Sequence, residues 1–374
     1  MKNIQLHKKI PKYITPFFFM LSVSILLGQD HGSDIRGRVI DSKTKDPVYF
    51  ADVFISNTTI GSATATDGTF KMNNIAPGRY EVIVHHIAYQ TKVLHVNLLK
   101  EKTVHLAVEL TLRVLSGKRV EIVAEREKSW QKHFQEFRKA FLGKTENAGY
   151  CHFLHPEVIN FTISQGWLFA STDSLIHIRN QALGYDIGLI LESFRCKSDQ
   201  IKYQIYPVFH PMPVKTTDDS IRWVRQRQKT YLGSFRHFLQ AVYHQSLDQE
   251  GMELYEVKQV GNKIYTWGST DRVGEDVKMT AKSDFPGLKS ICLKGHYMLL
   301  SHHIPRKTDK FVEQAKKGDF YQLEFYEPCF FNMNCDMALI DPLGNVHTPH
   351  AFSISGYWSV CGVADMLPFE YQPY

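Results

Sequence analysis

Hydrophobic residues alternate with polar or small residues along three short runs, IRGRVID, YEVIVHH and TKVLHVNL. A period of two is typical of β-strands that bury one face. Turn signals separate the runs, because Asp67-Gly68 supplies the positive φ of a tight turn and Pro77-Gly78 fixes one φ and frees the next. Residues 34–112 are therefore predicted to form an all-β sandwich, with Phe70 and Tyr80 closing its core.

The same stretch carries a family resemblance. In chain order it shows Ile35-x-Gly37-x-Val39, Pro47, Ala51-x-Val53, Thr66-Asp67-x-x-Phe70, Pro77-Gly78-x-Tyr80 and Ala88-Tyr89. These motifs resemble the carboxypeptidase-regulatory-like domain, a transthyretin-like β-sandwich. In that family the domain is named after its position behind a zinc carboxypeptidase, and it also stands at the front of many bacterial envelope proteins. The resemblance implies a fold and a compartment, and no reaction.

The hydrophobic pattern changes after residue 112. Lys118–Ala124 is predicted to form one more strand. Aromatic residues then recur at i, i+4, i+7 and i+11, which places them on one face of an amphipathic helix that ends near residue 142. They are Trp130, Phe134, Phe137 and Phe141. This stripe is predicted to belong to the core, and a ligand platform is the alternative.

A second long helix is predicted from Asp218 to His244. Its apolar stripe consists of Val224, Tyr231, Phe235, Phe238, Leu239 and Val242. Its basic residues are Arg222, Arg225, Arg227, Lys229 and Arg236. A basic cluster of this kind is usually a solvated face, and contact with phosphate or lipid head groups is the alternative.

Short runs rich in β-forming residues make up the remainder. The stretch from Cys151 to Phe209 is predicted to be a β-meander. Further strands are predicted at Leu254–Val257, Leu288–Leu293, Tyr297–Ser301, Phe320–Tyr326 and Met337–Ile340. The predicted fold class is therefore mixed: the N-terminal all-β transthyretin-like sandwich is followed by an α+β domain over residues 126–374, with antiparallel strands and two long amphipathic helices.

This second region carries a resemblance of its own. Its motifs are Phe141-Leu142-Gly143-x-Thr145-x-Asn147-Ala148, Asn180-x-x-Leu183-Gly184-Tyr185, Tyr231-x-Gly233-Ser234-x-x-His237-Phe238, Glu250-Gly251, Gly356-Tyr357-Trp358 and Ala364-Asp365-Met366-Leu367-Pro368-x-x-Tyr371. They resemble the long C-terminal part of bacterial envelope proteins that carry the regulatory-like domain. The resemblance implies no activity and transfers no functional residues.

Residues 1–28 are predicted to be a signal peptide. Four lysines give a basic start, and Phe17 to Leu27 is an apolar run too short to span a bilayer as a helix. The mature chain is expected to begin between Gln29 and His31, and a signal anchor is the competing interpretation. We therefore expect an exported protein, periplasmic or associated with the outer membrane, with no transmembrane segment after signal removal.

Charge and cysteine content narrow the possible functions. The formal net charge of +6 includes the four lysines of residues 1–28, where no acidic residue occurs, so the remainder carries +2. This removes the compositional argument for nucleic-acid binding. Six cysteines lie beyond the sandwich without CxxC spacing, which favours buried free thiols or one or two disulfides over metal ligands. They are Cys151, Cys196, Cys292, Cys329, Cys335 and Cys361.

No catalytic motif is complete in the sequence. His133-x-x-Glu136 has the spacing of zinc carboxypeptidase ligands, but it lies on the aromatic helix that is predicted to be buried. Gly143-Lys144-Thr145 resembles the end of a P-loop, but it follows a helix and lacks the first glycine. HExxH and GxSxG motifs are absent. In the pairs His85-His86 and His302-His303, one histidine is predicted to lie on the surface and the other in the core.

The sequence therefore predicts no catalytic, cofactor-binding or metal-ligating residues and no cofactor. The expected function is that of an exported non-catalytic binding or scaffold protein of the bacterial cell envelope. Its expected partner is an envelope protein, peptidoglycan or another glycan, and the turn around Asp67 or an edge strand is the expected contact. A hydrolase of unrecognised type that acts on envelope peptides or glycans is the alternative. A large outer-membrane barrel of about 22 strands is excluded by chain length.

Overall fold

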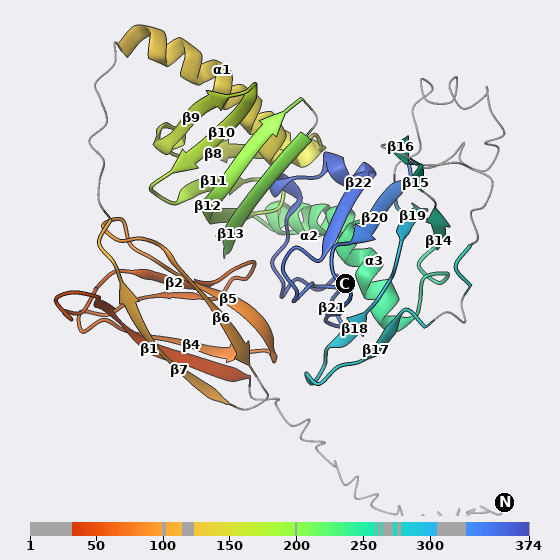
Figure 1. Cartoon of the computed structure of the whole chain (residues 1–374), viewed down its shortest axis with the longest axis horizontal. Helices are drawn as coiled ribbons and strands as arrows, with labels where there is room; N and C mark the ends of the chain where they lie inside the picture. Colours follow the sequence, from red (N-terminus) through yellow and green to blue (C-terminus); the bar gives the residue numbers. More distant parts are fainter. Residues whose placement is uncertain are drawn as a thin grey trace, which may run out of the picture. The chain divides into compact units, whose positions relative to one another are not determined.

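The computed structural model of the chain describes residues 32–98, 102–113, 123–198, 200–257, 259–260, 263–264, 272–274, 278–304 and 327–373 (Figure 1). The predicted signal peptide, the predicted strand Phe320–Tyr326 and residues 118–122 lie outside the described residues. Within the described part, no helix is both long and apolar enough to cross a membrane.

The N-terminal strands form two sheets, as the alternating pattern predicts. A three-stranded sheet has the order β4-β1-β7, in which β1 and β7 are parallel, and a four-stranded antiparallel sheet has the order β3-β2-β5-β6. The strands are β1 (Ser33–Asp41), β2 (Asp52–Ile55), β3 (Gly61–Ala63), β4 (Thr69–Ile75), β5 (Gly78–His85), β6 (Lys92–Leu98) and β7 (Thr103–Leu110). This arrangement confirms the predicted β-sandwich.

The sandwich core contains the residues that the pattern places inside it. Ile35, Val39 and Phe70 from one sheet share a cluster with Val82 and Val84 from the other. Tyr80 packs against this cluster from its rim and is only partly buried. Tyr80 therefore closes one side of the core, while Phe70 lies within it.

Strand β5 buries both of its faces, which differs from the prediction of one buried face. Ile83 is fully buried and shares a cluster with Phe54 of β2 and with Ile190, Tyr206 and Val208 of the following region. The sequence indicates this second buried face, because Phe54 and Ile83 are apolar at positions where a solvated strand face would be polar. The sandwich is thus packed against the rest of the chain through its second sheet.

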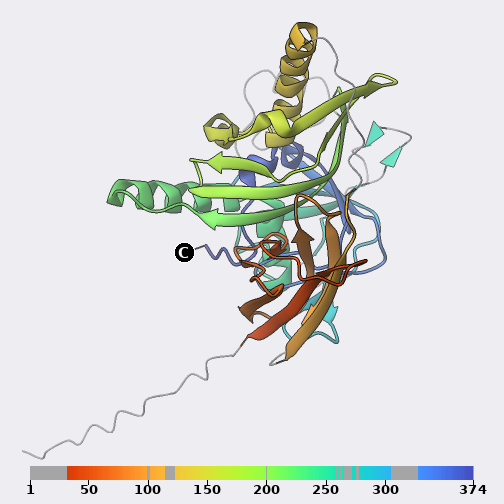
Figure 2. The same cartoon turned by 90° about the vertical axis from the view of Figure 1, so that its left-hand side faces the viewer.

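The next sheet departs from a simple meander. Its order is β8-β11-β12-β10-β9, with β13 on the other edge of β12. The strands are β8 (Cys151–Phe153), β9 (Ile159–Ser164), β10 (Trp167–Thr172), β11 (Ile176–Asn180), β12 (Tyr185–Lys197) and β13 (Gln200–Pro211). Because β12 has 13 residues, it accommodates β11 and β10 end to end along one edge and the whole of β13 along the other. Figure 2 shows this long green hairpin.

Helix α1 (Val123–Leu142) covers this sheet with the predicted aromatic stripe. Phe137 and Phe141 are fully buried and stack on each other at 4.7 Å, while Trp130 and Phe134 stack at 5.0 Å nearer the rim. The stripe belongs to the core, as predicted. Of the predicted strand Lys118–Ala124, only Val123 and Ala124 lie in the described residues. The prediction is wrong there, because these two residues begin the helix.

The predicted helix from Asp218 to His244 is two helices, α2 (Thr217–Tyr231) and α3 (Phe235–His244). Gly233 between them has φ +77°, and the side chain of Ser234 caps α3 by accepting a hydrogen bond from the His237 amide. Within α2, Trp223 is buried together with Tyr231, whereas Val224 is 37% exposed. Trp223 therefore replaces Val224 in the predicted stripe.

Helix α3 packs on the last large sheet, whose order is β14-β19-β20-β22. These strands are β14 (Met252–Val257), β19 (His296–Ser301), β20 (Cys329–Met333) and β22 (Phe352–Gly356). A three-stranded sheet of β17 (Thr280–Lys282), β18 (Lys289–Ile291) and β21 (Ala338–Ile340) and the pair β15 (Gln259–Val260) and β16 (Lys263–Ile264) complete the described strands. The antiparallel α+β character of this region is as predicted.

Candidate functional site at the junction of the sandwich and the α+β region

The loop between β2 and β3 joins the sandwich to β13. The Asn57 amide donates to the Pro207 carbonyl at 2.7 Å, and the Phe209 amide donates to the Thr58 carbonyl at 2.9 Å. Thr58 thereby forms a parallel bridge with Val208. The sandwich loop extends the edge of the neighbouring sheet, so the junction is built from backbone hydrogen bonds as well as from apolar contact.

The C-terminal tail closes the junction from the other side. The Phe369 amide donates to the Asn57 carbonyl at 2.7 Å, and Glu370 Oε1 accepts a hydrogen bond from the Thr59 amide at 2.9 Å. Arg236 of α3 holds the same tail, because its guanidinium donates to the carbonyls of Pro368, Phe369 and Tyr371. The partly buried guanidinium of Arg236 thus holds the segment that contacts the sandwich loop.

His347 makes the third contact across the junction. Its Nδ1 lies 3.0 Å from the Arg79 carbonyl of β5, and its Nε2 lies 3.0 Å from Asp341 Oδ2. The ring therefore bridges β5 of the sandwich and Asp341 of the α+β region. A Cβ at Gly78 would lie 2.9 Å from His347 Cε1, so this close approach requires glycine there.

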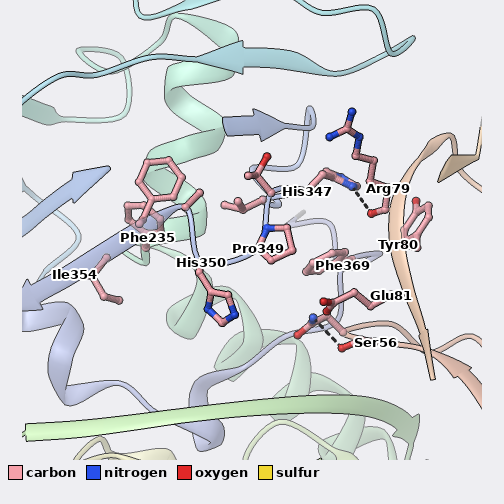
Figure 3. Close-up of a pocket in the computed structure, with 15 residues that line it drawn as sticks. Ser56, Arg79, Tyr80, Glu81, Phe235, His347, Pro349, His350, Ile354 and Phe369 are labelled. Atoms are coloured by element: carbon pink, nitrogen blue, oxygen red, sulfur yellow. Dashed lines mark hydrogen bonds between the residues drawn. The ribbon is translucent and has the colours of Figure 1, made fainter. Parts of the chain in front are cut away.

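A cavity of about 300 Å³ lies between these contacts (Figure 3). Its apolar wall comes from the α+β region and includes Phe235 of α3 with Phe352 and Ile354 of β22. Its polar wall includes Glu81 of the sandwich and His350 of the loop before β22. Concave sites with an apolar floor and a few polar groups are typical of ligand pockets.

Electrostatics and backbone conformation mark the same cavity. Burial raises the pKa of Glu81, and the electrostatic interaction with nearby His95 and His350 opposes this rise. Two of the lining residues, Asn57 and His350, have positive φ angles of 63° and 53°. Left-handed conformations of residues other than glycine are strained, and strained residues cluster at functional sites.

The cavity suits binding better than bond cleavage. Glu81 and His350 could exchange a proton with a bound molecule, but no serine, threonine or cysteine of the described lining is hydrogen-bonded to a base. Sequence reasoning singled out neither Glu81 nor His350 and gave Phe235 only a core role. Glu81 and His350 are far apart along the chain, and only the packing of the two regions brings them together.

A second cavity, of about 590 Å³, lies beside the start of α2. Its lining includes Arg222, part of the basic cluster for which contact with phosphate or lipid head groups is the alternative to a solvated face. Arg222 is paired with Asp219 at 2.7 Å, and Lys229 outside the cavity is paired with Glu146 at 3.0 Å. Arg227 donates to the Leu183 carbonyl and lies over the Tyr185 ring. Most of the cluster therefore serves intramolecular contacts, and Arg236 is partly buried and hydrogen-bonded to backbone carbonyls.

One trio of possible metal ligands is present in the described residues. Nitrogen and carboxylate atoms of His237, Glu250 and His303 lie within 4.8 Å of one another. His237 Nδ1 accepts a hydrogen bond from the Gly233 amide at 3.1 Å, so the neutral ring carries its proton on Nε2, which faces Glu250 Oε2 at 3.2 Å. A metal at Nε2 would turn Nδ1 into a donor that faces another donor. The trio does not fit a resident metal ion.

The other sequence motifs do not converge on a site. His133 packs edge-on against Phe161, and Glu136 accepts only a 4.0 Å contact from the Cys196 thiol. Gly143 follows α1 with φ +91°, and Thr145 donates to Asp365, so this segment forms no phosphate cradle. The structure thus gives the two motifs packing and hydrogen-bonding roles.

Histidine and cysteine predictions are corrected in part. His85 is buried and His86 is partly exposed, as predicted, but His302 and His303 are both exposed because they lie in the turn after β19.

All six cysteines are free. Burial raises the pKa of Cys151 to about 12 and that of Cys196 to about 11, so these thiols are protonated at neutral pH.

The C-terminal motifs that carry the resemblance are mostly contact residues. Asp365 accepts hydrogen bonds from Thr145 and Asn147, Asn180 donates to the Ala364 carbonyl, and Trp358 donates to the Gly233 carbonyl. Burial raises the pKa of Asp365, and these donors oppose the rise. The motifs therefore describe how this region folds together.

Comparisons with known proteins identify the first part of the chain. No curated protein matches its sequence. Among solved structures, similarity is found to the major pilin subunit BcpA of Bacillus cereus (19% identity, TM-score 0.19, 22% of this chain and 30% of that chain). It is also found to the minor pilin GBS52 of Streptococcus agalactiae (17% identity, TM-score 0.20, 25% and 49%) and to a putative carbohydrate binding protein from Bacteroides uniformis (8% identity, TM-score 0.19, 48% and 79%).

These structural similarities are local. The chain spans 30% to 49% of the length of the first pilin structures that it matches, and the TM-scores support no inference about function. The family comparison is more direct, because residues 35–122 match the model described as CarboxypepD_reg-like domain. The sandwich that forms one wall of the cavity is therefore a CarboxypepD_reg-like domain, carried in front of an α+β region.

Proposed function

We propose that this protein is an exported, non-catalytic binding or scaffold protein of the bacterial cell envelope, which holds its ligand in the junction cavity. The observation that carries the proposal is the cavity itself, because its walls come from two regions fixed to each other by His347, the β2–β3 loop and the C-terminal tail. A preformed pocket of about 300 Å³ is large enough for a side chain or a single sugar ring. The basic and apolar segment at residues 1–28 supports export.

Crosslinking in intact cells tests the binding role. Ile354 lines the cavity and is 43% exposed, whereas Ile163 on β9 is 59% exposed outside it. We expect Ile354→Lys to abolish a reproducible crosslink to an envelope protein or peptidoglycan, and Ile163→Lys to leave the crosslink unchanged. Equal effects of the two variants, or no crosslink in any envelope fraction, would contradict the proposal.

Export is tested separately. N-terminal sequencing of the protein from an envelope fraction should show a first residue between Gln29 and His31. An intact Met1 in a cytoplasmic pool would contradict this part of the proposal and leave the cavity unaffected.

A hydrolase is the second candidate, because Glu81 and His350 offer an acid and a base in one cavity. Turnover of envelope peptides or glycans by the purified mature protein, lost in both Glu81→Gln and His350→Ala, would favour it. We expect no turnover.

A further inference from the structure

One wall of the junction cavity is the edge of a sheet. Strand β22 is the last strand in the order β14-β19-β20-β22 and pairs with β20 along one side. An edge strand presents a row of N–H and C=O groups that can pair with another chain. The direction of these groups along β22 decides whether they are free.

The register fixes that direction. The Asn334 amide donates to the Ala351 carbonyl at 2.8 Å, and the Tyr357 amide donates to the Pro328 carbonyl at 3.1 Å. Hydrogen-bonded and non-hydrogen-bonded pairs alternate in an antiparallel ladder. Ser353 and Ser355 therefore direct their backbone groups toward β20, while Phe352 and Ile354 direct theirs outward. Among the described residues, no hydrogen bond is made to these outward groups.

The same two residues place their side chains in the cavity. Phe352 and Ile354 both line it, and Phe235 lies edge-on to Phe352 at 5.0 Å. Figure 3 shows Phe235 and Ile354 at this wall. Because side chains alternate along a strand, a chain that pairs with the outward groups of β22 would also direct every second side chain to one face of the sheet. The backbone groups and the apolar wall are thus two parts of one surface.

We infer that the junction cavity takes an extended polypeptide, which pairs with the outward groups of Phe352 and Ile354 as a fifth strand and places a large apolar side chain against Phe235. This inference rests on the proposed function and names the ligand class for that site. A glycan lacks alternating amide donors and acceptors at strand spacing, so the exposed edge favours polypeptide over sugar. The partner is a segment of another protein.

The test uses a phage-displayed library of random heptapeptides, selected on the immobilised full-length mature protein. The strongest peptide is then measured by fluorescence anisotropy against two variants. Ile354→Pro removes an outward N–H without removing a bond to β20, and proline is tolerated at such edge positions. Ile354→Val keeps that N–H with a similar side chain. We expect Ile354→Pro to weaken binding about tenfold or more and Ile354→Val to change it less than about twofold.

A scan of the peptide backbone tests the pairing without changing the protein. N-methylation of every second amide should abolish binding, and N-methylation of the intervening amides should leave it within about threefold of the unmodified peptide, because only one edge of the peptide faces β22. Equal effects of all methylations, or equal affinity of the proline and valine variants, would overturn the inference.

The remaining outcomes separate this inference from the proposed function. If no peptide is selected but soluble peptidoglycan fragments shift the NMR signals of Ile354, the binding function stands and the polypeptide inference fails. If neither probe binds, both fail. If sedimentation shows a dimer that Ile354→Pro dissociates, β22 pairs with a second copy and the inference of a different partner is wrong.

Discussion

Two buried histidines, one at the junction and one in the sandwich, have different hydrogen-bond partners. His347 lies 3.0 Å from the Arg79 carbonyl and 3.0 Å from Asp341 Oδ2. Burial would raise the pKa of Asp341, but hydrogen bonds from His347 and Asn345 hold it below its usual range. His85 instead contacts the Thr91 hydroxyl, and burial, with the nearby charge of Arg113, lowers its pKa to about 4.

The buried neutral His85 predicts a pH dependence of stability. An unfolded chain protonates this histidine near pH 6.5, whereas the folded protein does so only near pH 4. Between these values the unfolded state binds the extra proton, so the free energy of unfolding falls as the pH drops, by at most about 3 kcal/mol. His85→Gln should flatten the change in unfolding free energy between pH 7 and 5, measured by urea unfolding. His86→Gln, beside it, should retain the slope, and a slope unchanged in both variants would contradict the assignment.

Phe70 predicts the strength of the sandwich core. Its ring is 5% exposed and lies 2.7 Å from the Cβ position of Gly37, so little space remains around it. Phe70→Ala should lower the free energy of unfolding by about 3–5 kcal/mol, as truncation of buried aromatics does. Thr69→Ala removes only an exposed hydrogen bond to Asp67 and should cost less than about 1.5 kcal/mol. Equal small losses in chemical denaturation would show that Phe70 is not in the core.

At the scale of elements, local patterns predict strands and helices, while pairing depends on distant segments. The sandwich and the stripe on α1 follow from periods of 2 and 3.6, which are visible within one element. The local pattern predicts a meander, whereas the structure has a sheet centred on β12. Nothing in the local sequence indicates which edge β10 pairs with. Glu81 and His350 were missed for the same reason. Gly233-Ser234 indicates the break between α2 and α3, but the continuous apolar stripe favours a single helix and led to that prediction.

That break predicts the effect of a small substitution. Gly233 has φ +77°, and a Cβ there would lie 3.0 Å from the Ile304 side chain. Gly233→Ala should lower the free energy of unfolding by about 1–2 kcal/mol because of the left-handed backbone alone. Gly149→Ala is the control, since a Cβ there meets nothing within 4 Å and its φ is not positive. Thermal melts in which both variants match the parent protein would show that the turn is free to rearrange.

At the scale of the whole described region from residue 32 onward, the sandwich and the α+β region are held together by a few polar contacts around an apolar cluster. The cluster joins Ile83 to Tyr206, and the polar contacts join His347, the β2–β3 loop and the C-terminal tail. Asn57, His347 and Phe369 of these contacts line the cavity, so a loss of docking would also open the ligand site. Arg236 donates three hydrogen bonds to backbone carbonyls of the tail.

Removal of residues 368–374 should therefore leave the partly buried guanidinium of Arg236 with fewer hydrogen-bond partners. Arg236 would lose three of its four carbonyl partners and keep only Leu343, and burial already lowers its pKa. Breaking a buried charged contact on one side costs about 3–5 kcal/mol, whereas replacing the charge with an apolar side chain removes much of that cost. Arg236→Met should thus destabilise the full-length protein and stabilise the truncated one, measured as changes in urea midpoint. The result that tests the argument is an effect of Arg236→Met of opposite sign in the two proteins. If Arg236→Met destabilises both proteins equally, the tail does not supply the hydrogen-bond acceptors that the guanidinium needs. The closure of the junction then has another origin.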